Sequence, residues 1–355
     1  MDCSAEVLLK QLRRDFINSD LTVLTRKSFT LILLALIVAS GCNSSEDSAK
    51  TERQFLSIGT APPGGAFFPV GSAIAQAVSN NRGELPWQVS AEATKGTQEN
   101  IRRLASVELD FAMANAAISY FAVRGESGWE KQYSIRTVMT LAPNIALFIT
   151  RKSSGVKKIA DLKGKRVTVG VAGAGFEFFV RPILQAHGVT YDDFKPLYNT
   201  QTGAVDMLAD GSAVAAFLGG GVPTASIVQA SASQDIHFIP FEDGAKQSLY
   251  ETYPFFFPAT IPAGTYRGQE EAFAGMNVGP AHFITSADKD EDTVYQFTKI
   301  LYEHRAEVAK QHAAGKAINA KNVIKDTGTP FHPGAIRYFK EIGIWPEELA
   351  PASAE

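Results

Sequence analysis

The sequence contains little cysteine and no concentration of positive charge. Only Cys3 and Cys42 occur among its 355 residues, and 34 basic residues against 37 acidic ones leave a formal net charge of -3. Basic side chains gather only in pairs such as Arg102 and Arg103, without interleaved aromatic residues. Nucleic acid is therefore not an expected partner. With 45% hydrophobic residues, the composition is that of a globular protein of roughly two domains.

Sequence motifs of catalysis and metal binding are also missing. The histidines lack the spacing of metal ligands, and no cysteine or carboxylate cluster accompanies them. There is no Walker loop, no G-x-S-x-G elbow and no H-E-x-x-H helix. Residues 170–175 are rich in glycine but lack the G-x-G-x-x-G spacing of dinucleotide sites. We expect no metal, no cofactor and no catalytic residue, so an enzyme is the least favoured function class.

The N-terminal region has the order of an export signal. Arg26 and Lys27 precede the apolar run 29–39, which is followed by small residues and then by a polar stretch. The run is shorter than the about 20 residues of a membrane-spanning helix. We predict a signal peptide over residues 1–41, and the charged segment before Leu24 indicates a start assigned too early.

The residues directly before Cys42 resemble the lipobox of bacterial lipoproteins, although Ala39 stands where leucine is common. The resemblance implies cleavage before Cys42 and lipidation of this residue. Residues 42–53 would then be a flexible tether to the membrane, and Cys42 would have no partner for an internal disulfide. We expect a membrane-anchored periplasmic lipoprotein, with a plain secretory signal as the alternative.

From residue 54 onward, short apolar strands alternate with helical segments, which predicts an α/β fold with parallel strands. A second unit that repeats the first begins at residue 145. The proline- and aromatic-rich passage 253–266 is expected to be an extended segment that returns the chain from the second unit to the first. Lobe 1 would then comprise 54–144 plus 259–355, lobe 2 would comprise 145–258, and crossings near Pro143 and Pro258 would form a hinge beside a cleft.

Three loops of the first unit are candidates for a ligand site. Loops after parallel strands meet at one edge of a sheet, where open α/β folds bind ligands. The segment 59–68 is a glycine loop that runs into a helix, whose free N–H groups favour an anion. An ordinary strand-to-helix turn is the alternative. The loops 93–97 and 115–116 follow the next two strands, and Thr97 is the expected N-cap of helix 98–106.

Several short pieces of the chain occur in a fixed order: the glycine loop with Gly71, Thr97-x-x-Asn100, and segments 161–165, 173–177, 221–223, 258–266 and 332–335. This ordered set resembles the TAXI-type solute receptors of TRAP transporters, over residues 55–345. The resemblance implies a two-lobed periplasmic binding protein of type II-like fold, which closes around a small organic acid or amino acid and delivers it to TRAP membrane permease subunits. A receptor for another uptake system, or a sensor, is the second hypothesis.

Four residues depart from the usual pattern of that family. Phe67 and Phe68 stand where tyrosines are common, and Ala174 and Phe176 replace the serine and threonine of a frequent Gly-Ser-Gly-Thr loop. Because hydroxyl partners are lost, a heavily oxygenated ligand would leave buried polar groups unpaired, at about 1–3 kcal/mol each. We therefore expect a ligand that is less polar than glutamate.

Two acidic residues admit two interpretations each. Glu177, in the first turn of a helix, either complements the helix dipole and pairs with Arg181, or faces the amine of a ligand. Glu92 has the same two possibilities. His332, directly before a proline, is interpreted as a helix-entry residue. The predicted ligand-binding residues are Thr60, Gly64, Gly65, Phe67, Phe68, Glu92, Thr94, Thr97, Asn100, Asn115, Ala174, Gly175, Phe176, Glu177, Gly220, Gly221 and Tyr266.

Overall fold

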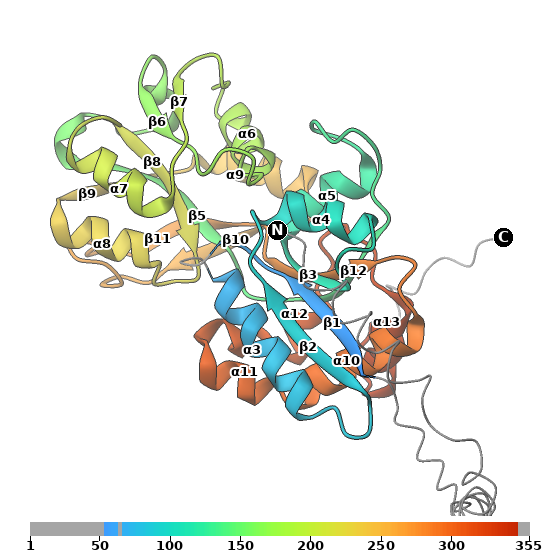
Figure 1. Cartoon of the computed structure of the whole chain (residues 1–355). Coiled ribbons are helices and arrows are strands. Elements are labelled where there is room, and N and C mark those ends of the chain that lie inside the picture. Colours follow the sequence, from blue (N-terminus) through green and yellow to red (C-terminus); the bar gives the residue numbers. More distant parts are fainter. Residues whose placement is uncertain (1–52, 63–65, 347–355) are drawn as a thin grey trace, which may run out of the picture. The chain divides into compact units, whose positions relative to one another are not determined.

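Two β-sheets with helices packed on them make up the described part of the chain (Figure 1). The computed structural model describes residues 53–62 and 66–346. The predicted signal peptide, Cys42 and nearly all of the predicted tether lie outside these residues. The same is true of Gly64 and Gly65 in the glycine loop.

The first sheet has five strands in the order β2-β1-β3-β12-β4. Its first three strands in the chain are parallel, and β12 runs antiparallel to both of its neighbours. The strands are β1 (Gln54–Gly59), β2 (Trp87–Glu92), β3 (Phe111–Asn115), β4 (Ile135–Thr140) and β12 (Ala281–Ser286).

The second sheet has the order β10-β11-β5-β8-β6-β7, with β9 also paired to β5. Strands β6, β7 and β8 are parallel to one another, whereas β5 is antiparallel to β8. The strands are β5 (Ile145–Arg151), β6 (Arg166–Thr168), β7 (Lys195–Leu197), β8 (Ala215–Gly220), β9 (Ile236–Ile239), β10 (Phe256–Ile261) and β11 (Phe273–Val278).

The two sheets repeat one topology, as the sequence predicts. In each sheet, three parallel strands are each followed along the chain by a helix. In the strand order, the second of these strands lies at the edge beside the first, and an antiparallel strand lies beside the third. The loops between these strands and helices therefore lie at the carboxyl ends of the parallel strands. The helices are α3 (Phe67–Asn80), α4 (Thr97–Ala105) and α5 (Ala116–Arg124) for the first sheet, and α6 (Glu177–Ala186), α7 (Gln201–Ala209) and α8 (Ala225–Ser233) for the second.

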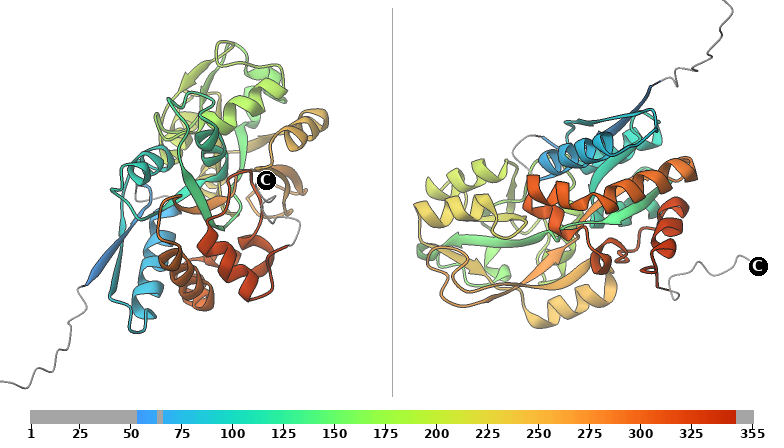
Figure 2. Two further views of the ribbon diagram at one scale, coloured as in Figure 1. Left: turned by 90° about the vertical axis from the view of Figure 1, so that its right-hand side faces the viewer. Right: turned by 90° about the horizontal axis from the view of Figure 1, so that it is seen from below.

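The C-terminal helices cover the first sheet beside α3 (Figure 2). The pattern over 290–311 predicts one helix, but the structure divides it at His304 into α10 and α11. His332 accepts a hydrogen bond from the Gly334 N–H (3.2 Å) as the N-cap of α13, which confirms its helix-entry role. The remaining helices are α9 (Asp243–Thr252), α10 (Glu291–Glu303), α11 (Arg305–Gln311), α12 (Ala320–Val323) and α13 (Pro333–Glu341), with short 3-10 turns at Lys152–Ser154, Ile159–Leu162 and Ala313–Ala317.

Strand β3 separates two hydrophobic cores. Successive side chains of a strand point to opposite faces, and Phe111 and Met113 belong to the core under α3, α10 and α13. Ala112 and Ala114 belong to the other core, which also contains α4, α5 and the interior of the second sheet. Helix α5 therefore packs against elements of both sheets.

The chain crosses between the sheets at residues 141–144, as predicted, and at residues 279–280, which was not predicted. The two crossings run side by side, because the Val278 N–H donates to the Asn144 carbonyl and the Ala281 N–H to the Ala142 carbonyl, both at 2.8 Å. The predicted crossing near Pro258 is wrong. Strands β10 and β11 hydrogen bond within the second sheet, so the boundary between lobe 2 and the returning part of lobe 1 moves from residue 258 to residue 278.

The proline-rich passage is instead an edge strand. Proline has no N–H to donate to a ladder, so within sheets it is confined to edges. Pro258 lies in β10, which has β11 as its only neighbour in the strand order.

The sequence also predicts a single strand over 278–284. Gly279, at φ +102°, interrupts that strand where the chain leaves one sheet for the other.

Candidate functional site

The ends of β1 and β2 are joined by hydrogen bonds of Thr60. Its N–H and its hydroxyl both donate to the Glu92 carbonyl, at 2.9 and 2.6 Å. The Thr94 hydroxyl donates in turn to the Thr60 carbonyl (2.9 Å) and accepts from the Gly96 N–H. Both threonines are buried. The first two candidate loops are thus connected directly.

Asn100 connects the third strand to the same point. Its amide donates to the Thr60 carbonyl at 2.7 Å and to the Met113 carbonyl at 2.8 Å. The side chain is fully buried, and its Oδ1 has no hydrogen-bond partner among the described residues. A Cβ at position 59 would lie only 2.7 Å from that oxygen, so the close packing of Asn100 requires Gly59.

Thr97 and Asn115 complete the connection. The Asn115 N–H donates to the Thr97 hydroxyl (3.1 Å), and its side chain accepts from the Ala117 N–H (2.9 Å) as the N-cap of α5. Thr97 is not the N-cap predicted for its helix, because α4 begins at Thr97 itself and Gly96 is the cap. Five of the predicted residues do come together: Thr60, Thr94, Thr97, Asn100 and Asn115. Every hydrogen bond found for their side chains goes to a main-chain atom. Their role in the structure is to shape the loops.

The phenylalanines of the glycine loop open helix α3. Phe67 is its first residue, and its half-buried side chain packs against the core of the first sheet. Phe68 is also half-buried, and its carbonyl accepts from the Ser72 hydroxyl at 2.8 Å. The first turn of α3 contains no acidic residue, and its N-cap, Ala66, has no polar side chain.

The loop between β6 and α6 reaches the first sheet at Gly175. A Cβ there would lie 2.6 Å from Ile118 Cδ1 of α5 and 3.3 Å from Gln98 Cγ of α4. Its φ of +92° also favours glycine. The loop after β6 therefore contacts the first turns of α4 and α5, which directly follow the carboxyl-end loops of the first sheet. This is the arrangement expected of a site shared by two sheets.

Phe176 and Ala174 lie beside this contact. The Phe176 ring lies over the backbone of Gly170, where a Cβ would be only 2.3 Å from its Cγ, and it packs against Phe179 with ring centroids 5.3 Å apart. Much of the aromatic surface gained at Phe176 is therefore used within its own loop. Ala174 is half-buried.

Glu177 lies in the first turn of α6 and influences two tyrosines. Burial and then the Glu177 carboxylate raise the pKa of Tyr198, and both also raise the pKa of Tyr191. Arg181 lies over the Tyr191 ring, 4.4 Å from its centroid, and within the described residues it forms no ion pair with Glu177. The predicted pairing of Glu177 with Arg181 is therefore not found, and the second interpretation, contact with a ligand amine, stays a prediction.

Glu92 pairs with a neighbour. Arg103 of α4 donates to its carboxylate at 2.8 Å and also contacts Glu108 at 3.3 Å. The hydrogen bond that Arg103 donates to Glu92 raises the pKa of Arg103, burial lowers it, and the pKa is raised overall. Glu92 thus supports the edge of β2.

The last predicted residues lie at the end of β8, directly after it, and after β10. Gly220 has φ +147°, and Gly221 is exposed. Tyr266 is only 3% exposed, and its hydroxyl accepts from the Thr224 N–H at 2.8 Å. The Tyr266 hydroxyl is therefore engaged in holding the start of α8.

Residues after β7 were missed by the sequence analysis. Tyr198 and Thr200 follow β7 in the place that Ala93 and Gly96 have after β2. The Tyr198 side chain is exposed, and Thr200 is the N-cap of α7. The Gln201 side chain donates a hydrogen bond to the Gly219 carbonyl (2.8 Å) and accepts one from the Ser226 hydroxyl (2.7 Å). These two bonds join the ends of β7 and β8. Aligning the two repeats would have identified this loop, but β7 is too short to stand out in the sequence.

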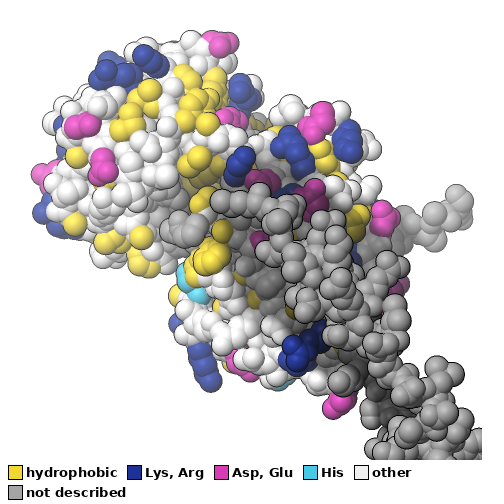
Figure 3. All heavy atoms as spheres, viewed as in Figure 1, with side chains coloured by type: hydrophobic (Ala, Val, Ile, Leu, Met, Phe, Trp, Pro, Cys, Tyr) yellow, Lys and Arg dark blue, Asp and Glu magenta, His cyan; other side chains and the backbone are white. Residues whose placement is uncertain are grey.

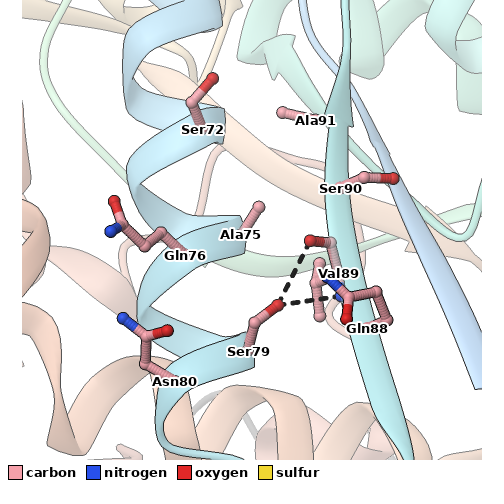
Figure 4. A pocket seen from close by; sticks show the side chains of 9 residues that line it. All are labelled: Ser72, Ala75, Gln76, Ser79, Asn80, Gln88, Val89, Ser90 and Ala91. Carbon is pink, nitrogen blue, oxygen red and sulfur yellow. Dashed lines mark hydrogen bonds between the residues drawn. The ribbon is translucent and has the colours of Figure 1, made fainter.

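A separate depression of about 330 Å³ lies between α3 and the edge strand β2 (Figure 4). Ser79 occupies the strand edge there, accepting from the Val89 N–H at 2.9 Å and donating to the Val89 carbonyl at 3.2 Å. None of the predicted ligand-binding residues lines this depression. Its lining consists of Ser72, Ala75, Gln76, Ser79, Asn80, Gln88, Val89, Ser90 and Ala91.

Charged side chains of both signs are scattered over the face shown in Figure 3, where hydrophobic side chains gather over the second sheet. Val171 and Tyr198, at 41% and 45% exposure, are among the exposed apolar residues of that sheet. In residues 53–62 and 66–346, no three histidine, cysteine, aspartate or glutamate side chains are grouped to hold a metal ion. No helix of this part has the length and apolar character needed to cross a membrane.

Two α/β sheets of one topology are the fold of periplasmic binding proteins, and a solved structure with a TM-score of 0.50 agrees. PhnD1 from Prochlorococcus marinus in complex with methylphosphonate matches with a TM-score of 0.50 and 10% identity, over 81% of this chain and 95% of that chain. The alkanesulfonate-binding protein SsuA from Xanthomonas axonopodis pv. citri bound to MOPS gives 0.45 and 15% identity, over 84% and 82%. An ancestral arginine-binding protein bound to arginine gives 0.45 and 18%, over 76% and 98%. The predicted fold class is confirmed.

The sequence comparison is more specific about ancestry. The chain belongs to the NMT1-like family, whose profile matches residues 58–343. The match includes both crossings and all carboxyl-end loops of the two sheets.

Proposed function

We propose that this protein is an extracytoplasmic solute receptor, which binds a small organic acid or amino acid between its two sheets and delivers it to a membrane permease. The observation that carries the proposal is the contact at Gly175 between the carboxyl-end loop after β6 and the first turns of α4 and α5. Sites formed in this way in α/β proteins hold small ligands. The match to the NMT1-like family and the likeness to PhnD1, solved in complex with methylphosphonate, support the same role.

The helix N-termini supply donors for a carboxylate. The N-cap residues of α3, α4 and α6 are Ala66, Gly96 and Phe176, none of which forms a side-chain cap. Main-chain N–H groups at such ends, together with the helix dipole, favour an anion. Helix α3 is the best candidate, because the first turns of α4 and α6 contain Glu99 and Glu177.

The same electrostatics suggest where an amine would lie. Glu177 and the ring of Tyr198 are close enough for the carboxylate to raise the pKa of the tyrosine. A carboxylate with a neighbouring aromatic ring attracts an ammonium group. An amino acid would thus place its carboxylate toward α3 and its amine toward Glu177. Replacing Glu177 by glutamine should weaken the binding of amino acids more than that of simple acids.

The four departures from the hydroxyl pattern favour a ligand less polar than glutamate, flanked by Phe67 and Phe68. Thermal-shift titration would compare butyrate, benzoate and phenylalanine with succinate, glutarate and glutamate. Monocarboxylates and aromatic acids should stabilise the protein more strongly at equal concentration. Tighter binding of the dicarboxylates would reject this ligand class without rejecting the receptor.

The permease is proposed to be of the TRAP type, as the sequence pieces that resemble TAXI receptors imply. Periplasmic location and a lipid anchor at Cys42 complete this proposal, which rests on the signal order of residues 26–42. A gene for a TRAP permease next to this gene would support it, whereas components of another uptake system or a sensor would favour the alternative. Loss of labelling by radioactive palmitate in Cys42→Ser would test the anchor.

One measurement addresses the receptor proposal itself. Native mass spectrometry of the purified protein, followed by denaturation, would identify a small molecule that co-purifies. We expect one acid or amino acid in a one-to-one complex, released unchanged. Conversion of the released molecule on incubation with fresh protein would instead indicate an enzyme.

A further inference from the structure

A ten-residue segment of the first sheet reaches across to the second. Residues 125–134 connect α5 to β4, and Gly125 (φ +68°), Ser127 (φ +56°) and Gly128 (φ +97°) turn the chain sharply. We call this segment the strap. It presents Trp129, which is 5% exposed, to Phe178 of α6, with ring centroids 5.7 Å apart. Helix α6 belongs to the second sheet, so this aromatic pair joins the two sheets.

The strap is held firmly on the side of the first sheet. Arg102 of α4 lies over the Trp129 ring, 5.0 Å from its centroid. The same guanidinium donates two hydrogen bonds to Glu130, at 3.2 and 3.3 Å, and the Tyr133 hydroxyl donates to the same carboxylate. These donors, the Arg102 hydrogen bond first, lower the pKa of Glu130 to about 2, so the pair stays charged near neutral pH. Trp129 is therefore held by Arg102 of α4, and it should stay with the first sheet when α6 moves.

On the side of the second sheet the contact is apolar and incomplete. Trp129 meets α6 through aromatic surface, and its indole N–H is buried without a hydrogen-bond partner among the described residues. A buried donor that lacks a partner opposes the closed contact, because water would satisfy it on opening. The aromatic contact, with the two rings tilted by 32°, favours the docked position, and the unpaired N–H favours release. A contact balanced in this way is suited to open and close.

The strap contact is adjacent to the candidate ligand site. Phe178 follows directly on the loop 173–177, in which Gly175 touches α4 and α5. Phe121 of α5 also packs against Phe178, with centroids 5.9 Å apart. Any separation of the sheets that opens the loop at Gly175 must therefore pull Phe178 away from Trp129.

We propose that the strap is a closure latch, in which docking of Trp129 on Phe178 sets the balance between closed and open forms of the two sheets. The latch rests on the proposed function only for its purpose, since closure would retain a solute. Its operation requires no ligand. It can therefore be tested, and can fail, independently of the receptor proposal.

The test compares two replacements of the same residue with different expected effects. Trp129→Ala removes the aromatic contact with Phe178, and Trp129→Phe keeps an aromatic ring but removes the unpaired N–H. Amide hydrogen exchange of the full-length chain, without added ligand, would be followed in α5 and α6 and, as an internal reference, in α13. Trp87→Phe is the matched control, because Trp87 is a buried tryptophan that packs against Phe297 in the core of the first sheet.

We expect Trp129→Ala to accelerate exchange in α5 and α6 about tenfold and to enlarge the radius of gyration in X-ray scattering, with α13 unchanged. Trp129→Phe should leave exchange equal to that of the parent or slower. Arg102→Gln, a change at a half-exposed residue that preserves the core, should accelerate exchange about threefold and serves if Trp129→Ala does not fold. Equal acceleration in all three helices, or identical behaviour of Trp129→Phe and Trp129→Ala, would mean that Trp129 is an ordinary core residue and would overturn the proposal.

Discussion

Acid should destabilise this protein through a histidine that directly follows the second crossing of the chain. His282 of β12 is fully buried, and burial lowers its pKa to about 3. Its Nε2 lies 2.6 Å from the Thr327 hydroxyl, whereas Nδ1 has no partner among the described residues. The folded protein therefore holds this ring neutral at a pH where the unfolded chain protonates it.

The sign and size of this loss of folding stability follow from proton linkage. An unfolded histidine has a pKa of about 6.5, so below that value the unfolded chain binds a proton that the folded protein rejects until about pH 3. Stability is thus lost as the pH falls from 7 toward 3. The expected loss from His282 is about 2 kcal/mol at pH 5 and approaches about 5 kcal/mol below pH 3.

Urea unfolding at pH 7 and pH 5 would measure this loss in the parent and in His282→Gln. The parent should lose about 2 kcal/mol more than the variant between the two pH values. His187 and His332, whose pKa values burial also lowers, contribute equally to both proteins and cancel. Thr327→Val removes the hydroxyl partner but keeps the titrating ring, so it should lower stability at both pH values and retain the parental pH dependence. Equal losses in His282→Gln and the parent would refute the reasoning.

Three further substitutions test the packing around the site, each by the free energy of urea unfolding. Gly279→Ala should cost more than about 2 kcal/mol, because φ is +102° and the new Cβ would lie 2.8 Å from Asn115 Oδ1; a neutral effect would contradict the crossing geometry. Asn100→Ala should cost about 1–3 kcal/mol, since the Met113 carbonyl loses this donor and the Thr60 carbonyl keeps only the Thr94 hydroxyl, and Asn100→Asp should not restore the lost hydrogen bonds. Glu92→Gln should cost less than about 1 kcal/mol and leave ligand affinity unchanged, because its half-exposed carboxylate pairs with Arg103; a large loss of affinity would return Glu92 to the ligand site.

The repeated strand and helix pattern was predictable because it depends on local sequence. Apolar strands such as 145–151 and glycine-rich turns such as 173–175 are recognisable without knowing their neighbours. The second crossing was not, because the apolar run 278–284 has the composition of one strand. Only the hydrogen bonds of Val278 and Ala281 show that it divides between two sheets.

The candidate site divides in the same way. The polar residues at the strand ends were correctly located, since parallel strands bring their carboxyl ends together. The partner of each side chain was not predictable, as Thr97, Glu92 and Tyr266 illustrate. Each can bond a ligand or the chain itself, and the choice depends on residues that are distant in sequence, Asn115, Arg103 and Thr224 respectively.

The sequence by itself determined the α/β alternation, the position of the glycine loops and the absence of the catalytic and nucleotide motifs, because these depend on residue type and short spacing. Only the tertiary structure decided which strands share a sheet, which polar groups are already bonded, and that Trp129 reaches Phe178 across the two sheets. The reason is that hydrogen-bonding capacity and apolar surface are local properties. The partners that satisfy them are brought together by strand order and sheet packing, which no short segment encodes.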